Sequence, residues 1–206
     1  MKIEKTFIIS LPYRLTDRLI PLIDYLKSIE LDYFTYSATY HVEGQIGLLI
    51  TIESLLTECV NEGYETIMVW EDDAKVVVDN LKEVIEESAS QLPEEWDCLY
   101  LGVNLFQDNV ELFSKNLIRI KSGWATHAII FSKSGMIKTI EAIRRYKHNK
   151  IPLDEIMVKH VQSEGNCFCT YPMFISQHNG YSDIQKKEMN YEKILENRFK
   201  EKTAHL

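Results

Sequence analysis

Three consecutive acidic residues, Glu71, Asp72 and Asp73, directly follow the apolar run Thr66–Trp70. Adjacent carboxylates ~4 Å apart repel each other by about 4 kcal/mol at an effective dielectric constant of 20. A divalent cation would turn that repulsion into attraction, because carboxylate oxygens are ligands that Mg²⁺ and Mn²⁺ prefer. Two side-chain carboxylates are too few to enclose such an ion, so we expect a diphosphate ligand to complete the coordination shell of the ion. An acidic turn, or the acidic start of a helix, explains the same residues without any ligand.

Two other magnesium-binding classes fit this triplet less well. A receiver domain has its paired acids after the first strand and an aspartate at a later strand end. Here the acids lie far along the chain, and the later run "YLGVN" ends in Asn104. A phosphatase of the haloacid dehalogenase type needs Asp-x-Asp followed by Thr or Val, whereas Ala74 follows the acids here.

Apolar, β-rich runs predict the strands that must position the acids. They cover residues 5–11, 32–38, 66–70, 97–102, 110–120 (one or two strands), 126–132 and 167–175. Amphipathic spacing predicts helices between them and at the end of the chain. These cover residues 19–30, 44–63, 79–91 with Asp79 as the cap, 134–146, 152–161 and 189–202.

This order of elements predicts an α/β fold whose sheet is mixed, mostly parallel and flanked by helices. Ligands of open α/β sheets bind beyond the carboxyl ends of the strands, which is where the acids are expected. The length of 206 residues suits a single domain, 1–206, with 189–206 as a C-terminal helix.

The formal net charge of −8 makes nucleic acid an unexpected partner, because phosphate backbones would be repelled. The sequence has no apolar run of the length that a transmembrane segment needs, and its N-terminal run is short for a signal peptide. We therefore expect a cytoplasmic protein. The four cysteines match no zinc-site spacing, so buried, reduced thiols are expected.

Six blocks of the sequence resemble family 25 glycosyltransferases, which include lipooligosaccharide galactosyltransferases and collagen-modifying relatives. The blocks are "FIISLPYRLTDR", "GQIGLLITIESL", "GYETIMVWEDDA", "LPEEWDCLYLG", "PLDEI" and "QHNGYSDI", in that order, between Thr6 and Ile184. The resemblance implies a nucleotide-binding GT-A fold and an inverting transfer from a nucleotide sugar. The implied donor is a UDP-sugar carrying galactose or glucose, and the implied acceptor is a glycan of a surface polysaccharide or glycoprotein.

The resemblance also implies a metal site for Mn²⁺ or Mg²⁺. Glu71 and Asp73 would form the acidic metal motif, and His178 would return to the metal late in the chain. The alternative for His178 is a surface residue that packs a turn.

The implied transfer needs a base that accepts the proton of the acceptor hydroxyl. Asp154 is the first candidate and Asp183 the second, although Asp154 also suits a helix N-cap. Arg14 and Arg18 could bind the diphosphate or pair with acids of a solvated loop.

The remaining candidates are residues at strand ends or aromatic residues that could contact the nucleotide or the sugar. They are Leu11, Ser37, Ala38, Trp70, Asp72 and Trp124. For Trp70, a core position at the end of a buried strand is the competing interpretation.

The sequence departs from the family pattern at three places. Pro12 stands where the family has an aspartate, Gln45 replaces a glutamate, and Thr51-Ile52 replaces Ser-His. These departures motivate a second hypothesis, a catalytically inactive sugar-nucleotide-binding or scaffolding domain with the same fold.

Overall fold

The computed structural model describes residues 2–206, and its centre is an eight-stranded sheet. The strands of this sheet are β1 (Lys5–Ser10), β2 (Phe34–Ser37), β3 (Thr66–Glu71), β5 (Cys98–Tyr100), β7 (Leu112–Ser114), β8 (Leu117–Arg119), β10 (Ala128–Ser132) and β11 (Cys167–Thr170). Their order across the sheet is β2-β1-β3-β10-β5-β11-β8-β7. The predicted α/β fold with a mixed sheet between helices is confirmed. The pairing is less parallel than predicted, because three of the seven strand pairings in this sheet are parallel and four are antiparallel.

The direction of the strands follows from the connections between them. Strand β1 pairs in parallel with both β2 and β3, because helical crossovers join these strands. Strand β10 is inserted antiparallel between β3 and β5, and β11 runs parallel to β5. The carboxyl ends of β2, β1, β3, β5 and β11 therefore meet at one edge of the sheet.

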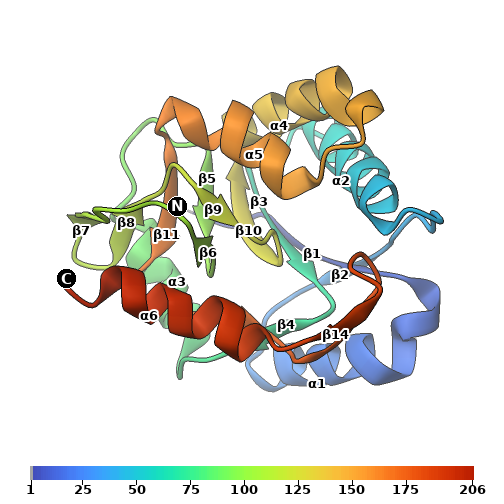
Figure 1. Ribbon diagram of the computed structural model, residues 1–206, viewed down its shortest axis with the longest axis horizontal. Helices are drawn as coiled ribbons and strands as arrows, with labels where there is room; N and C mark the ends of the chain where they lie inside the picture. Colours follow the sequence, from blue (N-terminus) through green and yellow to red (C-terminus); the bar gives the residue numbers. More distant parts are fainter. Residues whose placement is uncertain (1) are drawn as a thin grey trace.

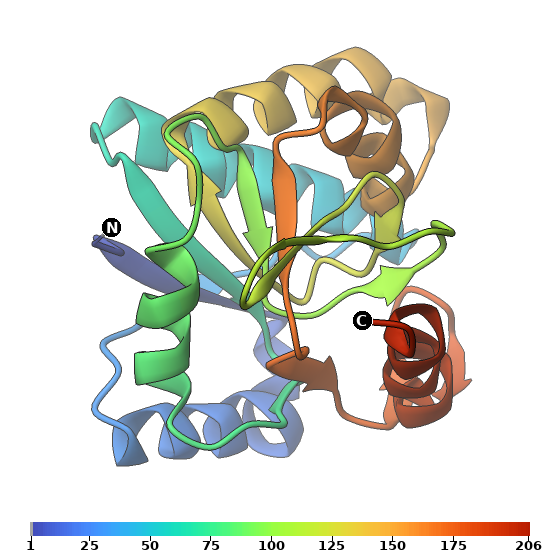
Figure 2. The same cartoon turned by 90° about the vertical axis from the view of Figure 1, so that its left-hand side faces the viewer.

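Helices cover both faces of the sheet (Figures 1 and 2). One face carries α2 (Gly44–Asn61), α4 (Lys133–Tyr146) and α5 (Leu153–His160), and the other carries α1 (Ile20–Ser28) and α3 (Leu81–Ala89). The residues of β3 alternate between these layers and are buried on both sides. This explains why Thr66–Trp70 is a continuous apolar run.

Short ladders bring the later part of the chain back to the carboxyl edge. Strand β4 (Ala74–Val76) follows the acids directly and pairs with β12 (Ile175–Gln177). Strand β6 (Asn104–Leu105) pairs with β9 (Gly123–Trp124). Strands β13 (Gly180–Ser182) and β14 (Lys187–Met189) form a hairpin.

Several predicted boundaries are wrong. Asp79 is not the cap of α3, which begins at Leu81 after Asn80 in the left-handed conformation, without a side-chain cap. The predicted last strand ends at Thr170 and resumes at Ile175, with Pro172 between the two parts.

The predicted C-terminal helix begins later than expected. Met189 belongs to β14, and a π-helical turn at Glu192–Glu196 precedes α6 (Asn197–Thr203). The expected state of the cysteines is confirmed, because all four are buried and free.

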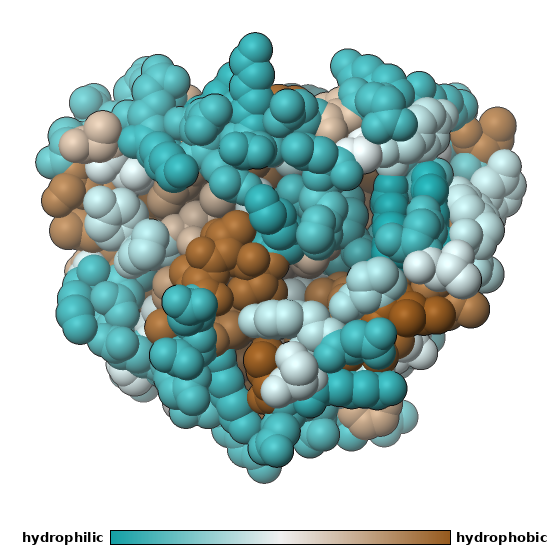
Figure 3. Space-filling view, turned by 90° about the horizontal axis from the view of Figure 1, so that it is seen from below, coloured by the Kyte–Doolittle hydropathy of each residue, from teal (hydrophilic) through white to brown (hydrophobic). Residues whose placement is uncertain are grey.

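The face that Figure 3 shows is mostly hydrophilic, with hydrophobic residues near its middle and towards its edges. Within residues 2–206, every helix is too short or too polar to cross a membrane.

Candidate active site

A cavity of about 460 Å³ lies beyond the carboxyl ends of β1 and β3, with the β13–β14 hairpin as one wall. Residues from distant parts of the chain line it. They include Ser10, Leu11, Arg18, Ala38, Glu71, Asp72, Asp73, Asn104, Trp124, Thr126, Asp154, Gln177, Tyr181 and Asp183. Most of the predicted site residues therefore lie around one cleft.

Glu71 is the last residue of β3, and its carboxylate accepts a hydrogen bond from the Thr126 hydroxyl at 2.9 Å. Burial, followed by the negative charge of Asp73, raises the pKa of Glu71 to about 8. Among residues 2–206, no positively charged side chain forms an ion pair with Glu71. A group of this kind favours either a proton or a bound cation.

Asp72 is buried next to Ser10 and Arg18. The Ser10 hydroxyl donates to Asp72 Oδ2 at 2.6 Å, and Arg18 Nη1 donates to Oδ1 at 3.3 Å. Burial raises the pKa of Asp72 to about 6, although both of these contacts favour the charged form.

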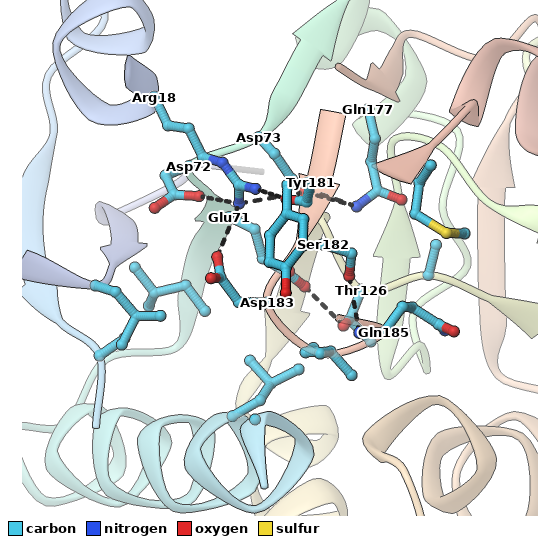
Figure 4. A pocket seen from close by; sticks show the side chains of 18 of the residues that line it. Arg18, Glu71, Asp72, Asp73, Thr126, Gln177, Tyr181, Ser182, Asp183 and Gln185 are labelled. Atoms are coloured by element: carbon cyan, nitrogen blue, oxygen red, sulfur yellow. Dashed lines mark hydrogen bonds and ion pairs between the residues drawn. The ribbon is translucent and has the colours of Figure 1, made fainter. Parts of the chain in front are cut away.

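Asp73 lies beside the start of β4, where the β4–β12 ladder brings Gln177 to it. The Gln177 amide nitrogen lies 3.3 and 3.2 Å from the two carboxylate oxygens of Asp73 (Figure 4). Arg18 Nη1 lies 3.9 Å from the same carboxylate.

His178 follows Gln177, and its backbone N–H donates to the carbonyl oxygen of Asp73 at 2.8 Å. Its imidazole lines the neighbouring cavity, which Asp73 also borders. Burial, followed by the charge of Lys75, lowers the pKa of His178, so the neutral, metal-binding form is favoured near pH 7. The chain thus passes beside Asp73 at His178, as predicted. The role of His178 as a metal ligand stays a prediction.

Arg14 and Asp183 form a bidentate ion pair that holds the β13–β14 hairpin against the loop that follows β1. Arg14 Nε and Nη2 each donate to Asp183 at 2.9 Å, and the Tyr13 hydroxyl donates to Asp183 at 3.2 Å. Arg18 adds a further contact, because its Nη2 donates to the carbonyl oxygen of Tyr181. Figure 4 shows the Arg18 guanidinium between Asp72 and Asp183.

Asp154 lies in the first turn of α5 and faces the cleft. The N-cap position is Pro152, so Asp154 is not the cap of this helix. Its Oδ1 accepts a hydrogen bond from the Ala125 backbone N–H at 2.9 Å. Burial raises the pKa of Asp154 to about 6, whereas that hydrogen bond lowers it.

The segment between β9 and β10 contacts both Asp154 and Glu71. Ala125 has a φ of 84°, which is rare for a residue with a side chain and is often found at functional sites. Its N–H holds Asp154, and the next residue, Thr126, holds Glu71. One strained turn therefore sets the positions of both carboxylates.

The remaining candidates divide into residues that line the cleft and residues that do not. Leu11, Ala38 and Trp124 line it, whereas Ser37 is exposed outside it. The proposed nucleotide contact of Trp70 is wrong, because its ring is 0% exposed among the residues that face α1 and α3. Trp70 alternates away from Glu71 along β3, so its ring lies in the core.

Ser10, Thr126 and Gln177 were not predicted, although each donates to one member of the triplet. Ser10 lies next to Leu11, the last residue of a predicted strand, and Gln177 adjoins His178, so their positions carried a weak signal. Thr126 carried none, because its approach to Glu71 depends on β10 pairing with β3.

The chemistry of the triplet fits a hard divalent cation, because it offers carboxylate oxygens with incomplete compensation of charge. Among residues 2–206, no three His, Cys, Asp or Glu side chains are grouped closely enough to hold a metal ion. Glu71 and Asp73 could therefore hold an ion only together with further oxygen ligands, such as water molecules or the oxygens of a bound phosphate.

Comparison with protein-family models gives no match. Among curated proteins, the chain is 27% identical over 164 residues to procollagen galactosyltransferase 1 of Danio rerio. This match covers 68% of the chain and 27% of the relative, so the chain spans about a quarter of that protein's length. The chain is thus distantly related to a galactosyltransferase, which confirms the predicted resemblance at that level.

Solved structures show a partial likeness of fold. UDP-glucose pyrophosphorylase in complex with UDP-glucose has a TM-score of 0.49 at 11% identity, covering 98% of this chain and 80% of that one. A mannose-1-phosphate geranyltransferase of Thermus thermophilus has a TM-score of 0.46 at 11% identity, covering 82% of this chain and 74% of that one. The likeness is limited to the general α/β fold.

Proposed function

We propose that this cleft transfers a hexose from a nucleotide diphosphate sugar to a hydroxyl group of a glycan, with inversion at the anomeric carbon. The observation that supports this most is the placement of Glu71, Asp73 and Asp154 around one cavity at the carboxyl edge of the sheet. The distant relation to a galactosyltransferase agrees with it. UDP with galactose or glucose is the proposed donor, and a surface polysaccharide or a glycoprotein carries the proposed acceptor.

In this proposal Asp154 is the base. It takes the proton of the acceptor hydroxyl while the acceptor oxygen attacks the anomeric carbon from the face opposite the diphosphate. The bond between the anomeric carbon and the phosphate oxygen breaks, and its electron pair leaves with the nucleotide diphosphate. Asp183 is less suited to this role, because Arg14 and Tyr13 already donate to its carboxylate.

The triplet would hold the diphosphate through Mn²⁺ or Mg²⁺. A divalent cation bound there would stabilise the negative charge that develops on the leaving diphosphate. Arg18 lies beside Asp72 and Asp73, where its guanidinium could also contact a phosphate oxygen. Gln177 would keep the Asp73 carboxylate in place.

The proposal is tested by binding followed by turnover. UDP and other nucleoside diphosphates are titrated with Mn²⁺, with and without a chelator, while tryptophan fluorescence is followed. Released UDP is then measured with a set of UDP-sugars. Binding that requires the cation, together with release from at least one sugar, supports the proposal, and no response to any nucleotide contradicts it.

An Asp73→Asn variant separates the role of the triplet from folding. We expect transfer to fall by at least about a hundredfold with the circular dichroism spectrum unchanged. Asp79→Asn removes an exposed acid outside the cleft and serves as the matched control. Full transfer activity in Asp73→Asn would remove this residue from the site.

A second candidate is a sugar-nucleotide-binding domain without transferase activity. The contacts of Arg18 with Asp72, Asp73 and Asp183 favour it, because a built-in cation already offsets part of the acidic charge. Cation-dependent binding of UDP without turnover on any donor sugar would support this candidate.

A further inference from the structure

Asn104 is a polar residue of the cleft to which the proposed chemistry gives no role. It lies in β6, directly opposite Trp124 of β9 in the ladder, and it lines the cavity. Its Oδ1 atom is buried and has no hydrogen-bond partner among the described residues. A buried acceptor without a partner is unfavourable, so a bound ligand that donates to it would relieve that cost.

The order of the strands indicates which part of a nucleotide sugar would lie near Asn104. The acids follow β3, which lies between β1 on one side and β10 and β5 on the other. Asn104 follows β5, whereas Leu11 and Ala38 follow β1 and β2. With about 4.8 Å between neighbouring strands, β1 and β5 are about 14 Å apart, and β3 lies between them.

A nucleotide sugar has the same linear order, with the diphosphate between the nucleoside and the sugar. If the triplet holds the diphosphate, the two ends of the donor must lie on opposite sides of β3. The β1–β2 side presents the exposed rings of Tyr13 and Tyr40, against which a flat base can pack. The β5 side presents the acceptor of Asn104 and the Asp154 carboxylate, which suit a group with several hydroxyls.

The strand β9, which pairs with Asn104, is fixed by hydrogen bonds and close packing. The Gln162 side chain accepts from the Gly123 N–H and donates to the Gly123 carbonyl, both at 2.8 Å. A Cβ atom at Gly123 would lie 2.4 Å from Val103, so only glycine permits this close packing. The Trp124 ring packs against Phe106 at 5.7 Å between centroids. Asn104 and Trp124 are therefore presented to the cleft from a rigid ladder.

We infer that Asn104 accepts a hydrogen bond from a hydroxyl of the donor sugar and that Trp124 packs against the apolar face of that sugar. This inference rests on the proposed function and extends it to the sugar-binding part of the site. A phosphate does not suit the same place, because it offers mainly acceptors and the nearby carboxylates repel it. Asn104 thus contributes to the choice of sugar and leaves nucleotide binding unchanged.

The test compares two ligands that differ only in the sugar. Dissociation constants for UDP and for UDP-galactose or UDP-glucose are measured with Mn²⁺ by calorimetry, and their ratio is followed across variants. Asn104→Ala removes the acceptor, and Asn104→Leu removes it while filling the same volume. Asn61→Ala, an exposed residue at the end of α2, is the matched control. Thermal melting shows whether each variant is folded.

We expect both Asn104 variants to weaken binding of the UDP-sugar by about tenfold and to change UDP binding by less than about twofold, since 1.4 kcal/mol corresponds to a factor of about ten. An unchanged ratio in a folded variant overturns the inference. If that unchanged ratio comes with equal losses for UDP and UDP-sugar, Asn104 contacts the nucleotide and not the sugar. A wild-type protein that binds neither ligand rejects the proposed function itself, and the inference with it.

Discussion

At the residue scale, the acidic residues of the cleft are buried in an environment that disfavours their charged form. Glu71, Asp72 and Asp154 each have a pKa raised mainly by burial, although each accepts at least one hydrogen bond. Several acids with raised pKa values in one cleft are typical of a site shaped for a ligand or a reaction. Arg18 offsets only part of their charge, through Asp72, Asp73 and Asp183.

We predict that Glu71→Gln stabilises the protein in the absence of nucleotide and metal. The pKa of Glu71 rises from its usual 4.5 to about 8 on folding, so the folded state loses stability as the pH rises through that window. The amide has no charge to bury and keeps an acceptor for Thr126. The melting temperature should therefore exceed that of the wild type at pH 8, by about 2–4 °C for each kcal/mol gained, and should match it near pH 4.5.

The control for this measurement is Glu62→Gln, which removes an exposed acid at the end of α2. Its melting temperature should follow the wild type at both pH values. A Glu71→Gln protein that melts at a lower temperature than the wild type at pH 8 would show that the carboxylate stabilises the fold.

Asp154 predicts the pH dependence of transfer. A base must be deprotonated, and burial raises the pKa of Asp154 to about 6. The rate should therefore rise from pH 5 to pH 7 and then level off. Asp154→Asn should lower kcat by about 10²–10⁴-fold and remove this rise. A wild-type rate that does not change between pH 5 and 7 would exclude Asp154 as the base.

At the scale of the elements, two late segments complete the site from a distance in the sequence. Strand β12 places Gln177 against Asp73, and the β13–β14 hairpin forms one wall of the cleft. The hairpin is anchored to the loop after β1 through Asp183, which contacts both Arg14 and Arg18. Their predicted phosphate-binding role stays a prediction.

We predict that Arg14→Gln loosens the hairpin without unfolding the protein. The variant loses both charged contacts with Asp183, so amide hydrogens at 180–189 should exchange faster. The global free energy of unfolding should change by about 1 kcal/mol or less, because the pair is partly exposed and screened by solvent. Lys115→Gln, which breaks the exposed pair with Glu87, should leave this exchange unchanged. Unaltered exchange at 180–189 in Arg14→Gln would show that the ion pair is not the anchor.

At the scale of the whole molecule, the sheet separates two apolar layers, and the site lies at the edge where they meet. The side of α2, α4 and α5 also receives Leu195 and Phe199 from the C-terminal segment. The side of α1 and α3 contains Trp70. This separation lets changes in the α1–α3 layer affect stability with little effect on the cleft.

We predict that Trp70→Ala lowers the free energy of unfolding by about 3–5 kcal/mol, because it opens a large cavity in a fully buried layer. Urea unfolding measures this loss. Below the transition, the affinity for UDP should stay within about twofold of the wild type. Phe34→Ala, at an exposed ring of β2, is the control and should cost much less. A large loss of UDP affinity in folded Trp70→Ala would return this residue to the nucleotide site.

The sequence by itself determined the layers of the fold and the centre of the site. Helical and strand periodicity reflects which faces are buried, and a run of acids after an apolar strand must lie at the end of that strand. The position of Glu71 and Asp73 at the end of β3 was therefore predictable, and so was the sheet between helices, whereas Asp154 was selected only through the family resemblance.

Only the tertiary structure decided which partners surround these residues. The direction of β10, the pairing of β4 with β12 and the anchoring of the hairpin depend on contacts between distant segments, which no local pattern encodes. Those contacts place Thr126, Gln177 and Asn104 at the cleft. They also bury the Trp70 side chain in the core. The side chains that donate hydrogen bonds to the acids could thus not be predicted from the sequence, because their contacts depend on pairing between distant strands.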